Sequence, residues 1–217
     1  MNELIKKNKT LFEVAESQQG LFTAKQAEEC GFIRSNHTYH VKSGQWIREH
    51  RGIYRLAMFP NSREEQLVMY SLWSQNREGD VQGVFSHETA LSHYELSDLN
   101  PSKLHMTVPN TFRRNSEIPK VLVLHFAEIA PNEIQLSRGF RVTKPLRTLQ
   151  DAISCKRISP EFVSQAISEA LNKGLIRRSQ LKVLLETAKE ANFFIKELVH
   201  HYRLALRAPP IQGFCKI

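Results

Sequence analysis

The chain has 217 residues, a hydrophobic fraction of 41% and a formal net charge of +8 at pH 7, with a sequence pI of about 9.5. This length suits one large domain or two small ones, and the apolar content excludes disorder over most of the chain. The excess of basic residues favours a polyanionic partner, because phosphates release counterions when basic side chains neutralise them; a basic surface with no partner is the alternative on charge alone.

The cysteines and the apolar runs indicate where the protein works. The chain has three cysteines, which lie far apart and form no CxxC pair: Cys30, Cys155 and Cys215. We therefore expect thiols in a reducing cytosol rather than a disulfide framework or a zinc site. No apolar run approaches the roughly 18 residues that a membrane-spanning helix needs. The segment 1–7 also lacks the apolar core of a signal peptide. We therefore expect a soluble, cytoplasmic protein without a membrane partner.

The first predicted elements are helices and a short extended piece. Apolar residues recur at helical spacing from Glu3 to Gln18, and Gly20 is expected to end this helix. Leu21 and Phe22 read as a very short strand. Thr23 then has the N-cap pattern of a capping box for a second helix that runs to about residue 30.

A third helix, predicted from Ser35 to Ser43, is the candidate for reading DNA. Ile33, His37 and Val41 are spaced to form its inward stripe. The opposite face combines side chains that can contact bases with side chains suited to phosphates. These residues are Arg34, Ser35, Asn36, Thr38, Tyr39 and Lys42. An ordinary solvated helix face is the alternative for any one of them.

A basic hairpin follows. Trp46–Ile47 and Ile53–Leu56 alternate as two strands with one buried face, and Gly44 stops the helix before them. Arg48, His50 and Arg51 gather at the tip, where phosphate contact is favoured over simple solvation. Two short helices and a basic hairpin fit a winged helix-turn-helix, which places its second helix in the major groove.

The chain after this hairpin predicts a second domain. Residues 58–62 break the pattern, so we divide the chain into a winged helix over residues 1–60 and a second domain over 61–217. Helices are predicted from Ser62 and Ser86, both as N-caps, and from Pro145. Strands are predicted near 81–85, 103–109, 121–126 and 140–142, and helices from Pro160 onward, including a last one over 193–206. The expected fold class is α+β, with a small sheet in a mixed α/β second domain and helices at its C-terminal end.

The sequence offers no catalytic constellation that we would assign. Its only aspartates are Asp80, Asp98 and Asp151, and it lacks the phosphate-binding GxxxxGK[ST] and GxGxxG patterns and the nucleophile pattern GxSxG. In Ser86-His87-Glu88, helix capping by Ser86 and a packed His87 are favoured over a triad, because adjacent helical residues point in different directions. We expect no enzyme activity, no cofactor and no metal site.

Several stretches together resemble the AbiEi family of antitoxins. They are 20–27, 46–56, Phe85-Ser86-His87-Glu88-Thr89-Ala90-Leu91, 104–109 and Val142-Thr143-Lys144-Pro145-Leu146-Arg147-Thr148-Leu149-Gln150-Asp151. This family belongs to bacterial type IV toxin–antitoxin systems, named for abortive infection of phage. Where the reading helix of the family usually carries more Arg and Lys, this chain has His37, Tyr39 and His40.

The resemblance implies a transcriptional repressor of its own operon that binds inverted repeats in double-stranded promoter DNA, where a homodimer would fit. It also implies a cognate nucleotidyltransferase-like toxin as partner. Two alternatives stay open: a nuclease or other DNA-processing enzyme targeted by the winged helix, which Mg²⁺-dependent cleavage would reveal, and a ligand-responsive regulator with a pocket in the second domain.

Overall fold

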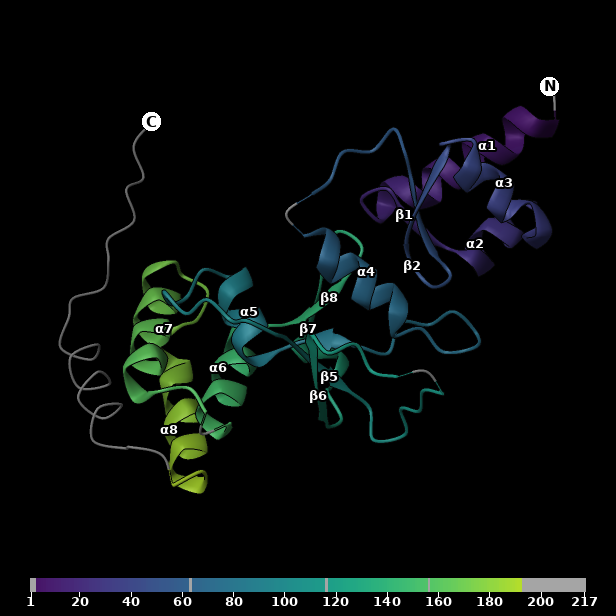
Figure 1. The fold of residues 1–217 in the computed structure, drawn as a ribbon. Coiled ribbons are helices and arrows are strands. Elements are labelled where there is room, and N and C mark those ends of the chain that lie inside the picture. The colour runs from purple at the N-terminus through teal and green to yellow at the C-terminus, as the bar shows by residue number, and fades with distance from the viewer. Residues whose placement is uncertain (1–2, 63, 116, 156, 193–217) are drawn as a thin grey trace, which may run out of the picture. The chain divides into compact units, whose positions relative to one another are not determined.

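The computed structural model describes residues 3–62, 64–115, 117–155 and 157–192 (Figure 1). These residues form two compact units. The first contains the described residues within 1–85, 107–117 and 124–142, and the second those within 86–106, 118–123 and 143–217. The chain is mixed α and β, as predicted.

The N-terminal part of the first unit has the predicted winged-helix order. Its elements are α1 (Glu3–Ser17), β1 (Leu21–Thr23), α2 (Ala24–Glu29), η1 (Arg34–Asn36), α3 (His37–Lys42), β2 (Trp46–His50) and β3 (Ile53–Leu56). The strands form an antiparallel sheet in the order β1-β3-β2, with Phe22 opposite Tyr54 and Trp46 opposite Leu56. The very short strand predicted at Leu21 and Phe22 is thus β1, which completes this three-stranded sheet.

Local signals set the start of α2. The Gln26 amide donates to Thr23 Oγ1 at 3.2 Å, and the Thr23 amide donates to Gln26 Oε1 at 2.8 Å, which confirms the predicted capping box. Gly20 lies before β1 at φ +92°, and a Cβ there would stand 2.5 Å from Phe59 Cβ. Both the conformation and this close approach require glycine.

An aromatic core holds these elements together. Its buried members are Leu11, Ala15, Phe22, Ala27, Phe32 and Trp46. The inward stripe predicted for the reading helix is wrong at its first position, since Ile33 is 68% exposed. Ile33 is the extended N-cap of the 3₁₀ turn η1, so helical spacing begins after it and Phe32 occupies the inward place.

Residues 57–62 contain neither helix nor strand, and the first unit continues past them through α4 (Glu65–Trp73) to β4 (Val84–Phe85). Helix α4 begins later than predicted: its N-cap is Glu64 without a side-chain cap, and the Ser62 hydroxyl donates to Gln19 Oε1 instead. The division at residue 60 stays a prediction.

A second sheet has five strands in the order β6-β5-β4-β8-β7. These are β4, β5 (Leu104–Val108), β6 (Leu122–Phe126), β7 (Ile134–Leu136) and β8 (Arg141–Thr143), with the 3₁₀ turn η2 (Pro131–Glu133) before β7. Strands β4 and β8 are parallel, with Phe85 opposite Val142.

The second unit is mainly helical. Its helices are α5 (His87–His93), α6 (Pro145–Ser154), α7 (Pro160–Asn172), η3 (Arg178–Gln180) and α8 (Leu181–Glu190). They enclose an aliphatic core to which α7 contributes Val163, Ala166, Ile167 and Ala170, as its periodicity predicts. The last predicted helix, over 193–206, and Cys215 lie outside the described residues.

Among the described helices, none is long and apolar enough to cross a membrane. Cys30 and Cys155 are both free thiols.

Candidate nucleic-acid interface

The predicted reading face lies at the surface of the first unit. Arg34, Ser35 and Asn36 form η1, while Thr38, Tyr39 and Lys42 lie on α3. All of these residues are exposed, and Tyr39 remains 66% exposed despite its large ring. The structure therefore brings the helix residues named from the sequence onto one continuous turn-and-helix segment.

The opposite side of α3 packs on aromatic rings. His37 is only 3% exposed; its ring lies 5.2 Å from that of Trp46 and 5.8 Å from that of Tyr54. His40 stacks on Trp46 at 4.6 Å, and its Nδ1 is 2.7 Å from Gln45 Oε1. Because residues three apart lie on the same side of a helix, fixing His37 and His40 inward turns Thr38 and Tyr39 between them outward.

The predicted wing is the β2–β3 hairpin. Arg48 and Arg51 are exposed, and Gly52 completes the tip at φ +74°. The strand register shifts between Arg48 and His50, as in a β-bulge. His50 is half-buried and its Nδ1 is covered, so less of this ring than of the two guanidinium groups is available to a phosphate.

Arg55 anchors the base of the wing, and the sequence alone did not identify it. This arginine is 7% exposed, and its Nε lies 2.9 Å from Glu49 Oε1 and 3.3 Å from Glu65 Oε1. Its Nη1 also donates to the Phe59 carbonyl at 2.6 Å. Two carboxylates and one carbonyl thus satisfy a buried cation and connect both strands of the hairpin to α4.

Arg34 has a partner on the surface. Its Nη1 lies 3.4 Å from Glu28 Oε1, and the side chains are 78% and 36% exposed. Exposed ion pairs of this kind contribute about 0–1 kcal/mol. A phosphate or a guanine edge can therefore displace Glu28 at little cost.

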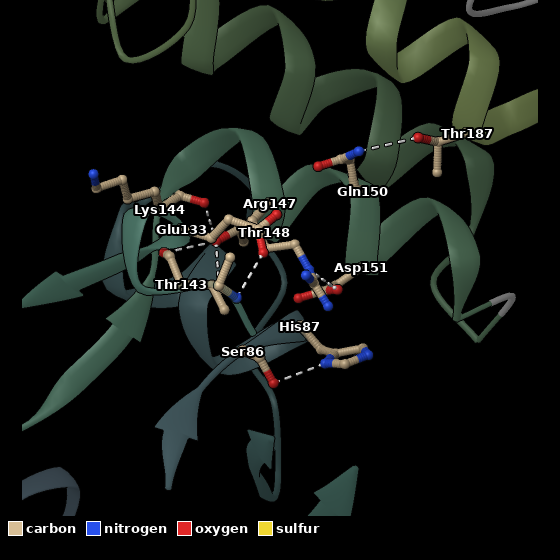
Figure 2. Close-up of polar contacts among 11 residues, drawn as sticks. Ser86, His87, Glu133, Thr143, Lys144, Arg147, Thr148, Gln150, Asp151 and Thr187 are labelled. Atoms are coloured by element: carbon tan, nitrogen blue, oxygen red, sulfur yellow. Dashed lines mark hydrogen bonds and ion pairs between the residues drawn. The ribbon is translucent and has the colours of Figure 1, made fainter. Parts of the chain in front are cut away.

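A polar cluster in the second unit contains Ser86-His87-Glu88, of which Figure 2 shows Ser86 and His87. Ser86 is fully buried, and its Oγ lies 2.8 Å from His87 Nδ1 rather than capping α5, which corrects the predicted role. His87 adopts φ +51°, and Glu88 Oε2 lies 3.5 Å from Nε2 of the buried His105. A fully buried hydroxyl cannot meet a substrate unless this helix moves.

The pKa of His105 lies below its ordinary value. Burial is the main cause, and the positive charges of Arg157 and Lys103 add to it. Burial and these two charges therefore favour the neutral form of the His105 imidazole.

The residues around the start of α6 bond mainly to one another (Figure 2). Thr148 Oγ1 lies 2.7 Å from Thr143 Oγ1 and 3.1 Å from the Lys144 carbonyl. Within α6, Arg147 Nε donates to Oδ1 of Asp151, which lies one turn further along the helix, at 2.8 Å. These contacts fix the beginning of the helix.

Comparisons with known proteins give one informative match. Residues 9–57 match the family described as "Transcriptional regulator, AbiEi antitoxin", so the N-terminal region of the chain is similar to this family. A crystal structure of the RV2827C protein from Mycobacterium tuberculosis aligns over 96% of this chain and 84% of that chain, with 10% sequence identity and a TM-score of 0.48. That similarity is too weak to establish a common fold. A comparison with curated proteins found no significant match.

Proposed function

We propose, from the AbiEi antitoxin and transcriptional-regulator domain at residues 9–57, that this protein is the antitoxin of a type IV toxin–antitoxin system. In the proposal it is a cytoplasmic protein that represses its own operon by binding inverted repeats in promoter DNA as a pair of copies. The observation that carries the DNA-binding part is the exposed η1–α3 segment next to a basic wing.

The chemistry of the exposed face suits the major groove. Arg34 offers a guanidinium for guanine or phosphate, Asn36 offers an amide for adenine, and Thr38 offers a methyl group for thymine. Tyr39 and Lys42 are suited to phosphates on either side. The wing arginines, Arg48 and Arg51, would hold the sugar–phosphate backbone, where the net charge of +8 adds a salt-dependent attraction.

The antitoxin part of the proposal is supported only by the similarity of residues 9–57 to the antitoxin family. The expected partner is a nucleotidyltransferase-like toxin encoded beside this chain. We propose no catalytic activity for the antitoxin itself, because its few aspartates are dispersed and Asp151 is engaged by Arg147.

A gel-shift assay with the upstream promoter fragment and random DNA of equal length tests the DNA-binding part. We expect clear preference for the promoter in the wild type and its loss in the double variant Arg34→Ala plus Arg51→Ala. The control is Arg138→Gln, since Arg138 is exposed and its contact with Gln19 uses the backbone carbonyl. Equal affinity of the wild type for both DNAs would reject the proposal, as would Mg²⁺-dependent cleavage of the probe.

Co-expression tests the antitoxin part. We expect the chain to restore growth of cells that express the nucleotidyltransferase-like protein encoded by the neighbouring gene. Growth arrest that persists at high antitoxin levels would reject this part and leave the DNA-binding part intact.

A further inference from the structure

A basic cleft of about 770 Å³ lies within the first unit. It is formed by the tip of the wing, by the loop after α4 and by the loop after β5. Its lining residues are Arg51, Gln75, Asn76, Arg77, Glu78, Gln82, Thr111, Arg113, Arg114 and Asn115. Every one of them is polar or charged, whereas pockets for small molecules are mostly apolar.

The charge of this cleft is strongly positive. Its lining contains four arginines and a single carboxylate, that of Glu78. Arg51, Arg77 and Arg113 are exposed, and none of the four arginines forms an ion pair with any described residue. Guanidinium groups without carboxylate partners are the groups that bind phosphates, with two parallel N–H donors each.

The wall formed by residues 75–81 is hydrogen-bonded to the winged helix. Lys25 of α2 donates through Nζ to the carbonyls of Arg77 at 2.9 Å and Glu78 at 2.6 Å. Within the loop, Asn76 Oδ1 accepts from the Asp80 amide at 2.8 Å. The backbone that carries Arg77 is therefore held against α2.

The second wall is attached to the first. Arg114 donates to the Gln75 carbonyl at 3.0 Å and lies over the Trp73 ring at 5.1 Å. Arg113 donates to the carbonyls of Asn110 and Phe112 at 3.0 and 2.8 Å, which orders the loop that carries it. The cleft is thus present before any ligand binds.

We propose that this cleft extends the DNA interface beyond the winged helix and binds backbone phosphates of the duplex that flank the operator. The inference rests on the proposed function, in which the wing binds DNA. The link between the two sites is Arg51, which belongs both to the tip of the wing and to the lining of the cleft. A strand whose phosphates meet the wing continues past Arg51 toward Arg77 and Arg113. These contacts add affinity and carry no sequence information.

The test compares the wild type with the double variant Arg77→Gln plus Arg113→Gln on two DNAs. One duplex contains only the operator half-site, and the other adds flanking base pairs on the side of the wing. On the longer duplex we expect the variant to bind about tenfold more weakly and its salt slope to fall by about two, uniformly for all flanking sequences. On the short duplex we expect equal affinities, and Arg138→Gln should match the wild type on both.

The outcomes separate this inference from the proposed function. If the wild type prefers promoter DNA but the double variant matches it in affinity and salt slope on both duplexes, the cleft proposal is wrong and the repressor proposal stands. If the double variant keeps its DNA affinity but no longer neutralises the toxin, the cleft binds a protein and the proposal is again wrong. If the wild type shows no preference for promoter DNA over random DNA, both the repressor proposal and the cleft proposal are wrong. Should the double variant not fold, as judged by circular dichroism, Arg77→Gln alone is expected to lower the salt slope by about one.

Discussion

The winged helix and the start of α6 differ in whether their polar side chains are exposed to solvent or buried and bonded to one another. On η1 and α3, histidine and tryptophan rings fill the inner side, while exposed side chains cover the outer side. The exposed residues are Arg34, Ser35, Asn36, Thr38, Tyr39 and Lys42. Around α6, Thr143 and Thr148 are fully buried and bond to each other. Polar groups that satisfy one another hold a fold together, whereas exposed polar groups on a rigid support are available to a partner. The comparison therefore supports the recognition role proposed for the first region, and it indicates that the second stabilises the fold.

The largest expected effect is on the aromatic support of the reading helix. Trp46→Ala should lower the free energy of unfolding by about 3–5 kcal/mol, because it removes a buried ring that contacts both histidines of α3. Tyr39→Ala on the exposed side of the same helix should change it by less than about 0.5 kcal/mol. Denaturant unfolding of both variants measures the difference, and similar losses would mean that α3 has no free face.

The second prediction concerns α6. Thr148→Val keeps the shape of the side chain but removes the hydroxyl that bonds to the buried Thr143 hydroxyl. The Lys144 carbonyl loses one of its two bonds and keeps the Thr148 amide as donor. We expect a loss of about 1–3 kcal/mol in unfolding free energy and no change in operator affinity at temperatures where the variant is folded. A variant of normal stability that binds the operator poorly would overturn the division between support and recognition.

The third prediction concerns the wing. Arg48→Gln plus Arg51→Gln should weaken binding about five- to tenfold for promoter and random DNA alike and lower the salt slope by about two, because both side chains are expected to contact phosphates. Titrations at several salt concentrations measure this. A change confined to promoter DNA would show instead that the wing reads bases.

The smallest expected effect is a pH dependence in the second unit. The pKa of His105 is lowered in the folded state by burial and by Arg157 and Lys103, so the unfolded chain takes up a proton more readily. Stability should therefore fall as pH drops below the ordinary histidine pKa of about 6.5, and the loss should level off once the folded state is protonated as well. Thermal unfolding between pH 7.5 and 5 should show a shallower decline for His105→Gln, and an identical decline would assign the effect to other groups.

The sequence predicts best where a signal is local. The Thr23–Gln26 capping box and the Pro145–Ser154 helix match the structure, because each depends on residues within one helix. Ser62 and Ser86 also carry the N-cap pattern, yet their hydroxyls bond elsewhere, to Gln19 and to His87. Spacing along the chain does not show which of several nearby partners a hydroxyl will choose.

The candidate interface was predicted only in part for a similar reason. The exposed face of α3 and the basic wing follow from periodicity and from a turn signal. The cleft arginines Arg77, Arg113 and Arg114 come from loops far apart in sequence, and they gather because Lys25 and Trp73 hold those loops in place. The sequence pattern did not predict that these loops would bring the three arginines together.

The most direct test of the central claim is the ratio of dissociation constants for random and promoter DNA, measured for the wild type and for Arg34→Ala plus Asn36→Ala. If the η1–α3 face reads bases, the wild-type ratio should be on the order of 10³ or more at physiological salt, and the variant should lose most of it while it retains binding to random DNA. An unchanged ratio in a folded variant would show that sequence is read by another part of the molecule.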